Sequence, residues 1–85
     1  MNYSKHIREA LKRAEFINVR GEVSIPLYRL KKELEKRNIP QKDFKDYLFT
    51  YASRTDRPYI EEVVVTLYGN DIDPDENFRI TSGLR

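Results

Sequence analysis

The stretch LYRLKKELEKRNIPQKDFKDYLFTYAS, residues 27–53, decides the fold. Its pattern predicts two amphipathic helices that are separated by a short break at residues 38–40. Apolar residues recur at the three-and-four spacing of a helix face, first as Leu27, Leu30 and Leu34 and then as Phe44, Tyr47, Leu48 and Tyr51. Two such helices so close in sequence must pack on each other, so the stretch predicts a helix-turn-helix unit.

The break itself carries three local signals that agree. Asn38 is suited to the left-handed conformation that ends a helix, and Ile39 is a hydrophobic plug for the turn. Pro40 bars continuation of the first helix and can open the next one. We therefore expect helices at about residues 27–37 and from residue 41 to 52 or 53. A tight unit of this kind with lysines on its open side is a common means of presenting a helix to DNA.

The residues before this unit predict one more helix and a short strand. Ile7, Ala10, Leu11, Ala14 and Ile17 repeat at helical spacing, so we expect a helix over residues 4–17, with Asn2 or Ser4 as its N-cap. Gly21 supplies the backbone freedom for the turn that follows. Residues 22–25 alternate polar and apolar side chains and stop at Pro26, which predicts a very short strand.

The residues after the unit predict a two-stranded hairpin. Residues 59–68 are rich in β-branched and aromatic side chains around Val63-Val64-Val65, which favours a strand, and residues 78–82 alternate as a second strand beyond an acidic loop. The first of these strands is apolar on both faces. The face that carries Ile60, Val64 and Tyr68 forms the contact of a homodimer, or else the first helix or the tail covers it.

The composition indicates a single folded domain, residues 1–85. An apolar fraction of 39% with ten aromatic residues suffices for one small core, and the absence of cysteine excludes disulfides and thiolate metal sites. The apolar runs are too short for a membrane span or a signal peptide, so we expect a cytoplasmic protein that binds no membrane. A charged fraction of 35% without cysteine leans toward a thermophile's composition.

The net charge of +2 conceals an uneven distribution. Residues 1–57 contain fourteen Lys/Arg and eight Asp/Glu, whereas residues 58–85 contain two and six. The basic part holds the predicted helices. Such an asymmetry suits a polyanionic partner, although excess lysine on helices serves equally well as a solvated surface.

The predicted order of elements resembles that of the winged helix-turn-helix family over nearly the whole chain. Ile39, Phe44 and Tyr47 match apolar positions of that family and Asn38 stands at its turn glycine, whereas Arg37 replaces an aliphatic residue. The resemblance implies an α+β winged helix whose third helix enters the major groove and whose hairpin loop, the wing, lies on the adjacent backbone. It also implies sequence-specific binding of double-stranded DNA by a small transcriptional regulator.

Helical spacing selects the candidate binding residues. With Phe44 pointing inward, a rotation of about 100° per residue turns one set of side chains outward or to the N-terminal edge of the third helix: Gln41, Lys42, Lys45, Asp46, Phe49 and Ser53. Lysine and glutamine can read base edges, and an exposed aromatic can contact deoxyribose. A second set offers cations to phosphates: Arg20, Arg29, Lys32, Lys36, Arg54 and Arg57.

The acidic loop competes with this interpretation. Asp71, Asp73, Asp75 and Glu76 would repel phosphates from a wing. Their alternate spacing is similar to the start of a calcium loop, but the sharp-turn glycine and later glutamate are missing, so we expect a solvated turn and no metal. The alternative function is a winged helix that serves as a protein-interaction or oligomerisation module, with Phe49 and the valine strand as contacts.

Catalysis finds little support in the sequence. His6 is the single histidine, and Glu61 and Glu62 would point to opposite faces of the predicted strand, so no acid–base pair arises. No glycine-rich loop is present to cradle a phosphate. We therefore expect no enzyme, no cofactor and no small-molecule substrate.

Overall fold

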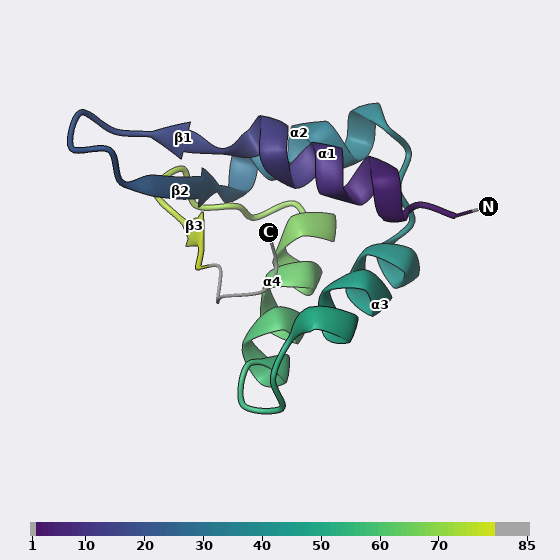
Figure 1. Ribbon diagram of the computed structural model, residues 1–85. Coiled ribbons are helices and arrows are strands. Elements are labelled where there is room, and N and C mark those ends of the chain that lie inside the picture. The colour runs from purple at the N-terminus through teal and green to yellow at the C-terminus, as the bar shows by residue number, and fades with distance from the viewer. Residues whose placement is uncertain (1, 80–85) are drawn as a thin grey trace.

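The computed structural model describes residues 2–79, which form four helices and a small antiparallel sheet of three strands. The α+β class is thereby confirmed. The elements follow in the order α1 (Ser4–Ala14), β1 (Phe16–Ile17), β2 (Val23–Pro26), α2 (Leu27–Lys36), α3 (Gln41–Tyr51), α4 (Arg57–Tyr68) and β3 (Asn77–Phe78). Helix α1 packs on α2, α3 packs on α4, and the sheet extends from the first pair (Figure 1).

Helices α2 and α3 confirm the predicted helix-turn-helix. Leu27, Leu30 and Leu34 of α2 are buried, as are the three apolar residues that α3 turns inward, Phe44, Tyr47 and Leu48. Tyr51 departs from the prediction because it lies in the last turn and remains 46% exposed. Burial of a side chain of this size contributes about 1.5–3 kcal/mol, so these two faces supply much of the stability of the pair.

Helix α1 is shorter than predicted. It ends at Ala14, because the next residue, Glu15, takes extended backbone angles of φ −60° and ψ 140°. Ile17, expected on the buried face of the helix, lies in β1 and is 63% exposed. The N-cap expected at Asn2 or Ser4 is wrong, because Tyr3 holds that position and no side chain caps the helix. Asn2 Oδ1 accepts the backbone N–H of Ser4, the first residue of α1, at 2.9 Å.

The predicted strand over residues 59–68 is wrong, since these residues form helix α4. Ile60, Val63, Val64 and Leu67 are its buried residues, at the spacing of one helix face. Pro58 lies in the first turn, where a missing N–H costs nothing. Of the two alternatives for the face that carries Ile60 and Val64, cover by the rest of the chain is the one observed: both side chains are 1% exposed and belong to the core, with α2 and α3 packed on α4.

Strand β2 is the centre of the sheet, and it confirms the short strand predicted before Pro26. It pairs with β1 through Phe16↔Ser24 and Ile17↔Val23, and with β3 through Ile25↔Phe78 and Pro26↔Asn77. Of the predicted last strand, 78–82, Phe78 lies in β3 and pairs with β2 instead of with residues 59–68, whereas Arg79 is outside the strand. Residues 80–82 lie outside the described part of the chain.

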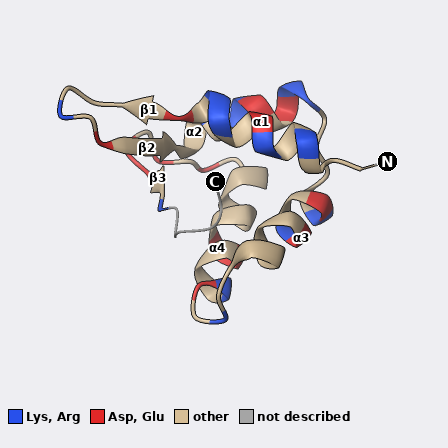
Figure 2. Ribbon diagram, in the orientation of Figure 1, with Lys and Arg blue, Asp and Glu red and all other residues tan. Residues whose placement is uncertain are grey.

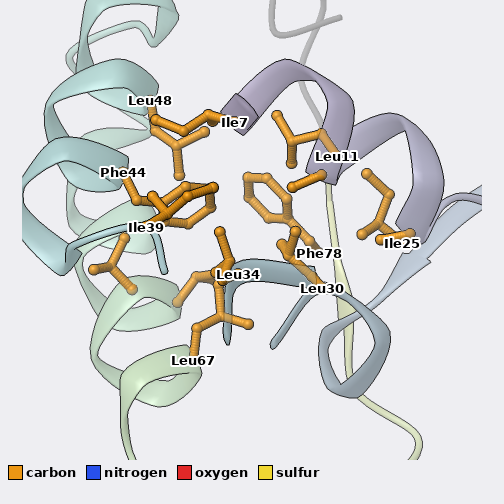
Figure 3. Packing of buried hydrophobic residues seen from close by; sticks show 14 of the residues in the cluster. Ile7, Leu11, Ile25, Leu30, Leu34, Ile39, Phe44, Leu48, Leu67 and Phe78 are labelled. Carbon is orange, nitrogen blue, oxygen red and sulfur yellow. The ribbon is translucent and has the colours of Figure 1, made fainter. Parts of the chain in front are cut away.

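One hydrophobic core joins every element except β1, whose two residues are exposed. Side chains from the four helices, β2, β3 and the α2–α3 turn form it, and Figure 3 shows Phe44 and Phe78 reaching into it from α3 and β3. Among residues 2–79, no polar or charged residue is fully buried. The longest helix in this range, α4, has 12 residues, and none is long and apolar enough to cross a membrane.

Arg37 ties the two N-terminal helices together. Its guanidinium donates a hydrogen bond of 2.9 Å from Nη1 to Glu9 Oε2 on α1, and its Nε lies 3.7 Å from Glu33 Oε1 on α2. This hydrogen bond from Arg37 holds the pKa of Glu9 below its usual range. The arginine that departs from the winged-helix pattern therefore has a structural partner on α1.

Candidate nucleic-acid interface

The turn between α2 and α3 sets the direction of the candidate recognition helix. Asn38 has φ 54°, and its N–H donates to the Glu35 carbonyl at 3.1 Å. The N–H of Ile39 donates to the Leu34 carbonyl at 3.1 Å, which completes a Schellman motif. Ile39 is 3% exposed. The predicted left-handed cap and hydrophobic plug are both confirmed.

The C-terminal end of helix α4 also contacts the α2–α3 turn. The hydroxyl of Tyr68 donates to the Ile39 carbonyl at 2.7 Å, and Lys31 Nζ on α2 donates to the carbonyl of Gly69. Burial, with a further contribution from the charge of Asp43, raises the pKa of Tyr68 to about 12. The phenol therefore keeps its proton and remains a donor at any ordinary pH.

The first turn of α3 presents two of the predicted residues to solvent. Gln41 and Lys42 are both exposed and directly follow Pro40. In helix-turn-helix proteins, residues near the N-terminus of the second helix contact base edges. These two side chains occupy that position.

Lys45 and Phe49 lie one and two turns after Gln41 on the same side of α3, and both side chains contact α4 residues. Lys45 Nζ lies 3.2 Å from Glu61 Oε1 on α4 and 5.4 Å from the centre of the Phe49 ring. Phe49, which the sequence predicted to be exposed, is partly buried against the core because α4 packs beside it. The guanidinium carbon of Arg57 also lies 5.4 Å from that ring, so two cations flank one aromatic.

Three more of the predicted residues, Ser53, Arg54 and Arg57, follow the C-terminal end of α3, which we call the exit of α3. Ser53 Oγ donates to Asp56 Oδ2 at 2.9 Å and lies 2.9 Å from Thr55 Oγ1, so its hydroxyl serves the α3–α4 turn. Arg54 is exposed within this turn, and Arg57 is exposed at the start of α4. Both arginines therefore lie at the corner where α3 meets α4.

Arg20 and Lys32 lie on other elements. Arg20 is exposed at the tip of the β1–β2 hairpin, and Figure 1 shows that tip at the upper left, apart from the α3–α4 corner at the bottom. Lys32 is exposed on α2, with its Nζ 5.9 Å from the ring of Tyr28. Seven of the predicted contacts thus lie along α3 and its exit, namely Gln41, Lys42, Lys45, Phe49, Ser53, Arg54 and Arg57, whereas Arg20 lies on the hairpin and Lys32, like Arg29 and Lys36, lies on α2.

The charges of α3 are separated by side. Successive turns place Gln41, Lys45 and Phe49 in one row, whereas Asp43, Asp46 and Thr50 line a shallow cavity of about 250 Å³ between α3 and the N-terminus of α1. Tyr47 and Tyr51 line the same cavity. Hydrogen bonding of Arg8, on α1, to these two tyrosines raises the pKa of its guanidinium. Asp43 and Asp46 therefore lie on the side of α3 toward α1, Lys45 lies on the side toward α4, and Lys42, one turn before Asp46, lies between the two sides.

The sequence interpretation underestimated a second basic region. Residues 4–37 contain ten Lys/Arg and five Asp/Glu, whereas residues 38–79 contain five and nine. Lys5, Arg8 and Lys12 are exposed on one face of α1, and Figure 2 shows basic residues recurring along that helix. Their i, i+3, i+7 spacing was a signal for a shared face that the sequence already contained.

The acidic loop does not form a wing. It runs from the end of α4 to β3, and Figure 2 shows its acidic residues near the sheet, away from the α3–α4 corner. Asp73 Oδ1 accepts the N–H of Asp75 at 3.0 Å, and the Glu76 carbonyl accepts the N–H of Leu27 at 2.9 Å. Within residues 2–79, no group of three or more acidic or histidine side chains converges as a metal site.

Comparisons of the chain with protein-family models, with curated proteins and with solved structures gave no match.

Proposed function

We propose that this domain binds double-stranded DNA in a sequence-specific manner, as a small cytoplasmic transcriptional regulator, with α3 as its recognition helix. The observation that carries the proposal is the division of α3 into two sides. Gln41 and Lys42 are exposed at the start of α3 and Lys45 is half-exposed beside α4, whereas Asp43 and Asp46 line the cavity toward α1. The acidic loop, which would repel phosphates, lies at the other end of α4.

In this proposal the contacts have separate tasks. Gln41 and Lys42 meet base edges in the major groove. Arg54 and Arg57 at the exit of α3 meet phosphates, which supplies affinity without sequence preference. Phe49 keeps Lys45 and Arg57 close together, because both cations lie 5.4 Å from its ring.

The proposed relationship is with winged helix-turn-helix proteins, in a modified form. The unit α2–α3, the short strand before α2 and the return of β3 to that strand support it. The position of the wing's first strand is taken by a helix, and β1 completes the sheet. The DNA contact accordingly rests on α3 and the α3–α4 corner.

The test is a fluorescence-anisotropy titration of duplex DNA across a range of salt concentrations. The double change Lys42→Ala with Lys45→Ala should weaken binding and reduce the preference for one sequence, because Lys42 is assigned to base edges; the slope of log K against log salt should fall by roughly one for each of the two lysines that also contacts a phosphate. Replacing Lys5 and Lys12 on α1 by alanine removes the same charge and should have a smaller effect. Equal losses from the two pairs, or unchanged binding after the first, would refute α3 as the interface.

The alternative is a protein-interaction or oligomerisation module that does not bind DNA. It draws support from the formal neutrality of α3, whose two lysines are matched by two aspartates, and from exposed apolar residues on the β1–β2 hairpin. A chain that shows no micromolar or tighter duplex binding near physiological salt, but sediments as a dimer, would favour this alternative.

A further inference from the structure

The β1–β2 hairpin is a preformed arm. The N–H of Gly21, which has φ 79°, donates to the Asn18 carbonyl at 3.0 Å. Asn18 Oδ1 accepts the N–H of Arg20 at 2.9 Å and that of Glu22 at 3.0 Å. A three-residue loop of this type, closed by a left-handed glycine, is a stable hairpin connection. The arm needs no partner to acquire its shape.

The arm exposes much of the apolar surface of the described chain. Four of the large hydrophobic residues exposed in residues 2–79 lie on it: Phe16 at 49%, Ile17 at 63%, Val19 at 104% and Val23 at 40%. Its charged residues are Glu15, Arg20 and Glu22, so residues 15–24 carry a formal charge of −1. An arm that gripped phosphates would carry several cations, whereas a nearly neutral apolar arm suits contact with protein.

The backbone of β1 is equally open to pairing. β1 lies at the edge of the sheet, with β2 as its neighbour. The N–H of Asn18 donates to the Glu22 carbonyl at 3.0 Å, so the adjacent pair Ile17↔Val23 is the non-hydrogen-bonded kind. The N–H and C=O of Ile17 consequently point away from β2, toward the open edge.

We infer that a second copy of this chain occupies that edge, with its own β1 antiparallel to the first. A two-fold axis at Ile17 would let each Ile17 exchange two backbone hydrogen bonds with Ile17 of the second copy, because the same outward groups are present on both. Ile17 and Val23 of both copies would then cover one another. The low charge of the arm means that two identical copies do not repel strongly. The resulting sheet would have six strands in the order β3-β2-β1-β1-β2-β3.

The test uses the fact that Ile17 of one copy lies opposite Ile17 of the other at the two-fold axis. Sedimentation equilibrium of the full chain without nucleic acid should show a monomer–dimer equilibrium. Ile17→Lys and Ile17→Glu should each weaken self-association roughly tenfold, because like charges then lie opposite each other. An equimolar mixture should restore association, since a lysine then faces a glutamate. Val65→Lys on α4, at a residue that is 65% exposed, is the matched control and should dimerise as the parent does.

A wild-type chain that stays monomeric, single variants that associate like the parent, or a mixture that fails to recover association would each overturn the inference.

A second experiment, disulfide cross-linking, tests the same pairing if a charged variant does not fold. The chain has no cysteine, so Ile17→Cys introduces a unique thiol. Residues directly opposite in such a pair have Cα atoms about 5.5 Å apart, which a disulfide can span. Oxidation should give a cross-linked dimer faster for Ile17→Cys than for Val65→Cys; equal rates would contradict the pairing.

Discussion

The two junctions on either side of α3 are built in opposite ways. The α2–α3 junction has four residues, Arg37 to Pro40, and holds a left-handed asparagine, a buried isoleucine and the hydroxyl of Tyr68. The α3–α4 junction, residues 52–56, is mostly exposed and is held by the Ser53 hydroxyl and its polar neighbours. The first is part of the core, and the second is part of the surface.

This difference indicates where the orientation of α3 is determined. Buried contacts are costly to break, whereas hydrogen bonds between exposed groups exchange readily with water. The angle between α2 and α3 should therefore resist substitution, and the α3–α4 corner should tolerate it. Three substitutions test the contrast in order of expected effect.

The largest effect is expected for Ile39→Ala. The side chain is 3% exposed, so its truncation leaves a cavity and should lower the free energy of unfolding by about 2–5 kcal/mol. Urea denaturation followed by circular dichroism measures this. A loss below about 1 kcal/mol would show that the turn can collapse around the gap and that the plug is not essential.

An intermediate effect is expected at Asn38. With φ 54°, alanine in its place should cost about 1–2 kcal/mol, because a Cβ without a polar side chain is disfavoured in the left-handed region. Asn38→Gly should be nearly neutral, since glycine adopts this conformation freely. Thermal unfolding of both variants gives the comparison. Equal losses for alanine and glycine would indicate that the asparagine side chain, and not the backbone angle, stabilises the turn.

The smallest effect is expected for Ser53→Ala at the second junction. The lost hydrogen bonds, each 2.9 Å long, lie on an exposed turn, so stability should change by no more than about 0.5 kcal/mol. The same denaturation assay applies. A loss as large as that of Asn38→Ala would remove the contrast between the two junctions.

The sequence was most informative where local chemistry and packing agree. Asn38, Ile39 and Pro40 each have a local reason to end one helix or begin the next, and the leucines of α2 have a single face to bury. The prediction failed at residues 59–68 because the β-branched run Val63-Val64-Val65 outweighed another signal. Ile60, Val63, Val64 and Leu67 already had helical spacing, and tertiary burial of that face overrides the weak preference of valine for strands.

The hairpin was missed for a different reason. Ile17 continues the helical spacing of α1, so no local pattern separates a longer helix from a helix that ends at Ala14. The pairing of β1 with β2 is a tertiary contact, which the spacing of apolar residues does not encode. The Asn18–Gly21 turn was visible in sequence, but the strand before it has two residues and gives almost no alternation to recognise.

For the candidate site, the sequence predicted which residues of α3 point outward but not what lies beside them. Gln41 and Lys42 are exposed as expected, whereas Phe49 is partly covered and Lys45 pairs with Glu61 because α4 lies alongside. Those neighbours come from the residues that were predicted to be a strand. Because residues 59–68 were predicted as a strand, the contacts that α4 makes with Lys45 and Phe49 of α3 were not predicted.

The exposed arm also has a consequence for how this chain can diverge between lineages. All eight residues from Phe16 to Val23 are exposed, so mutations among them leave the core contacts intact. Asn18 and Gly21 are the exceptions, because their hydrogen bonds and the positive φ of Gly21 hold the loop. The other residues of the arm can therefore be exchanged to alter what it binds while the helices keep their arrangement.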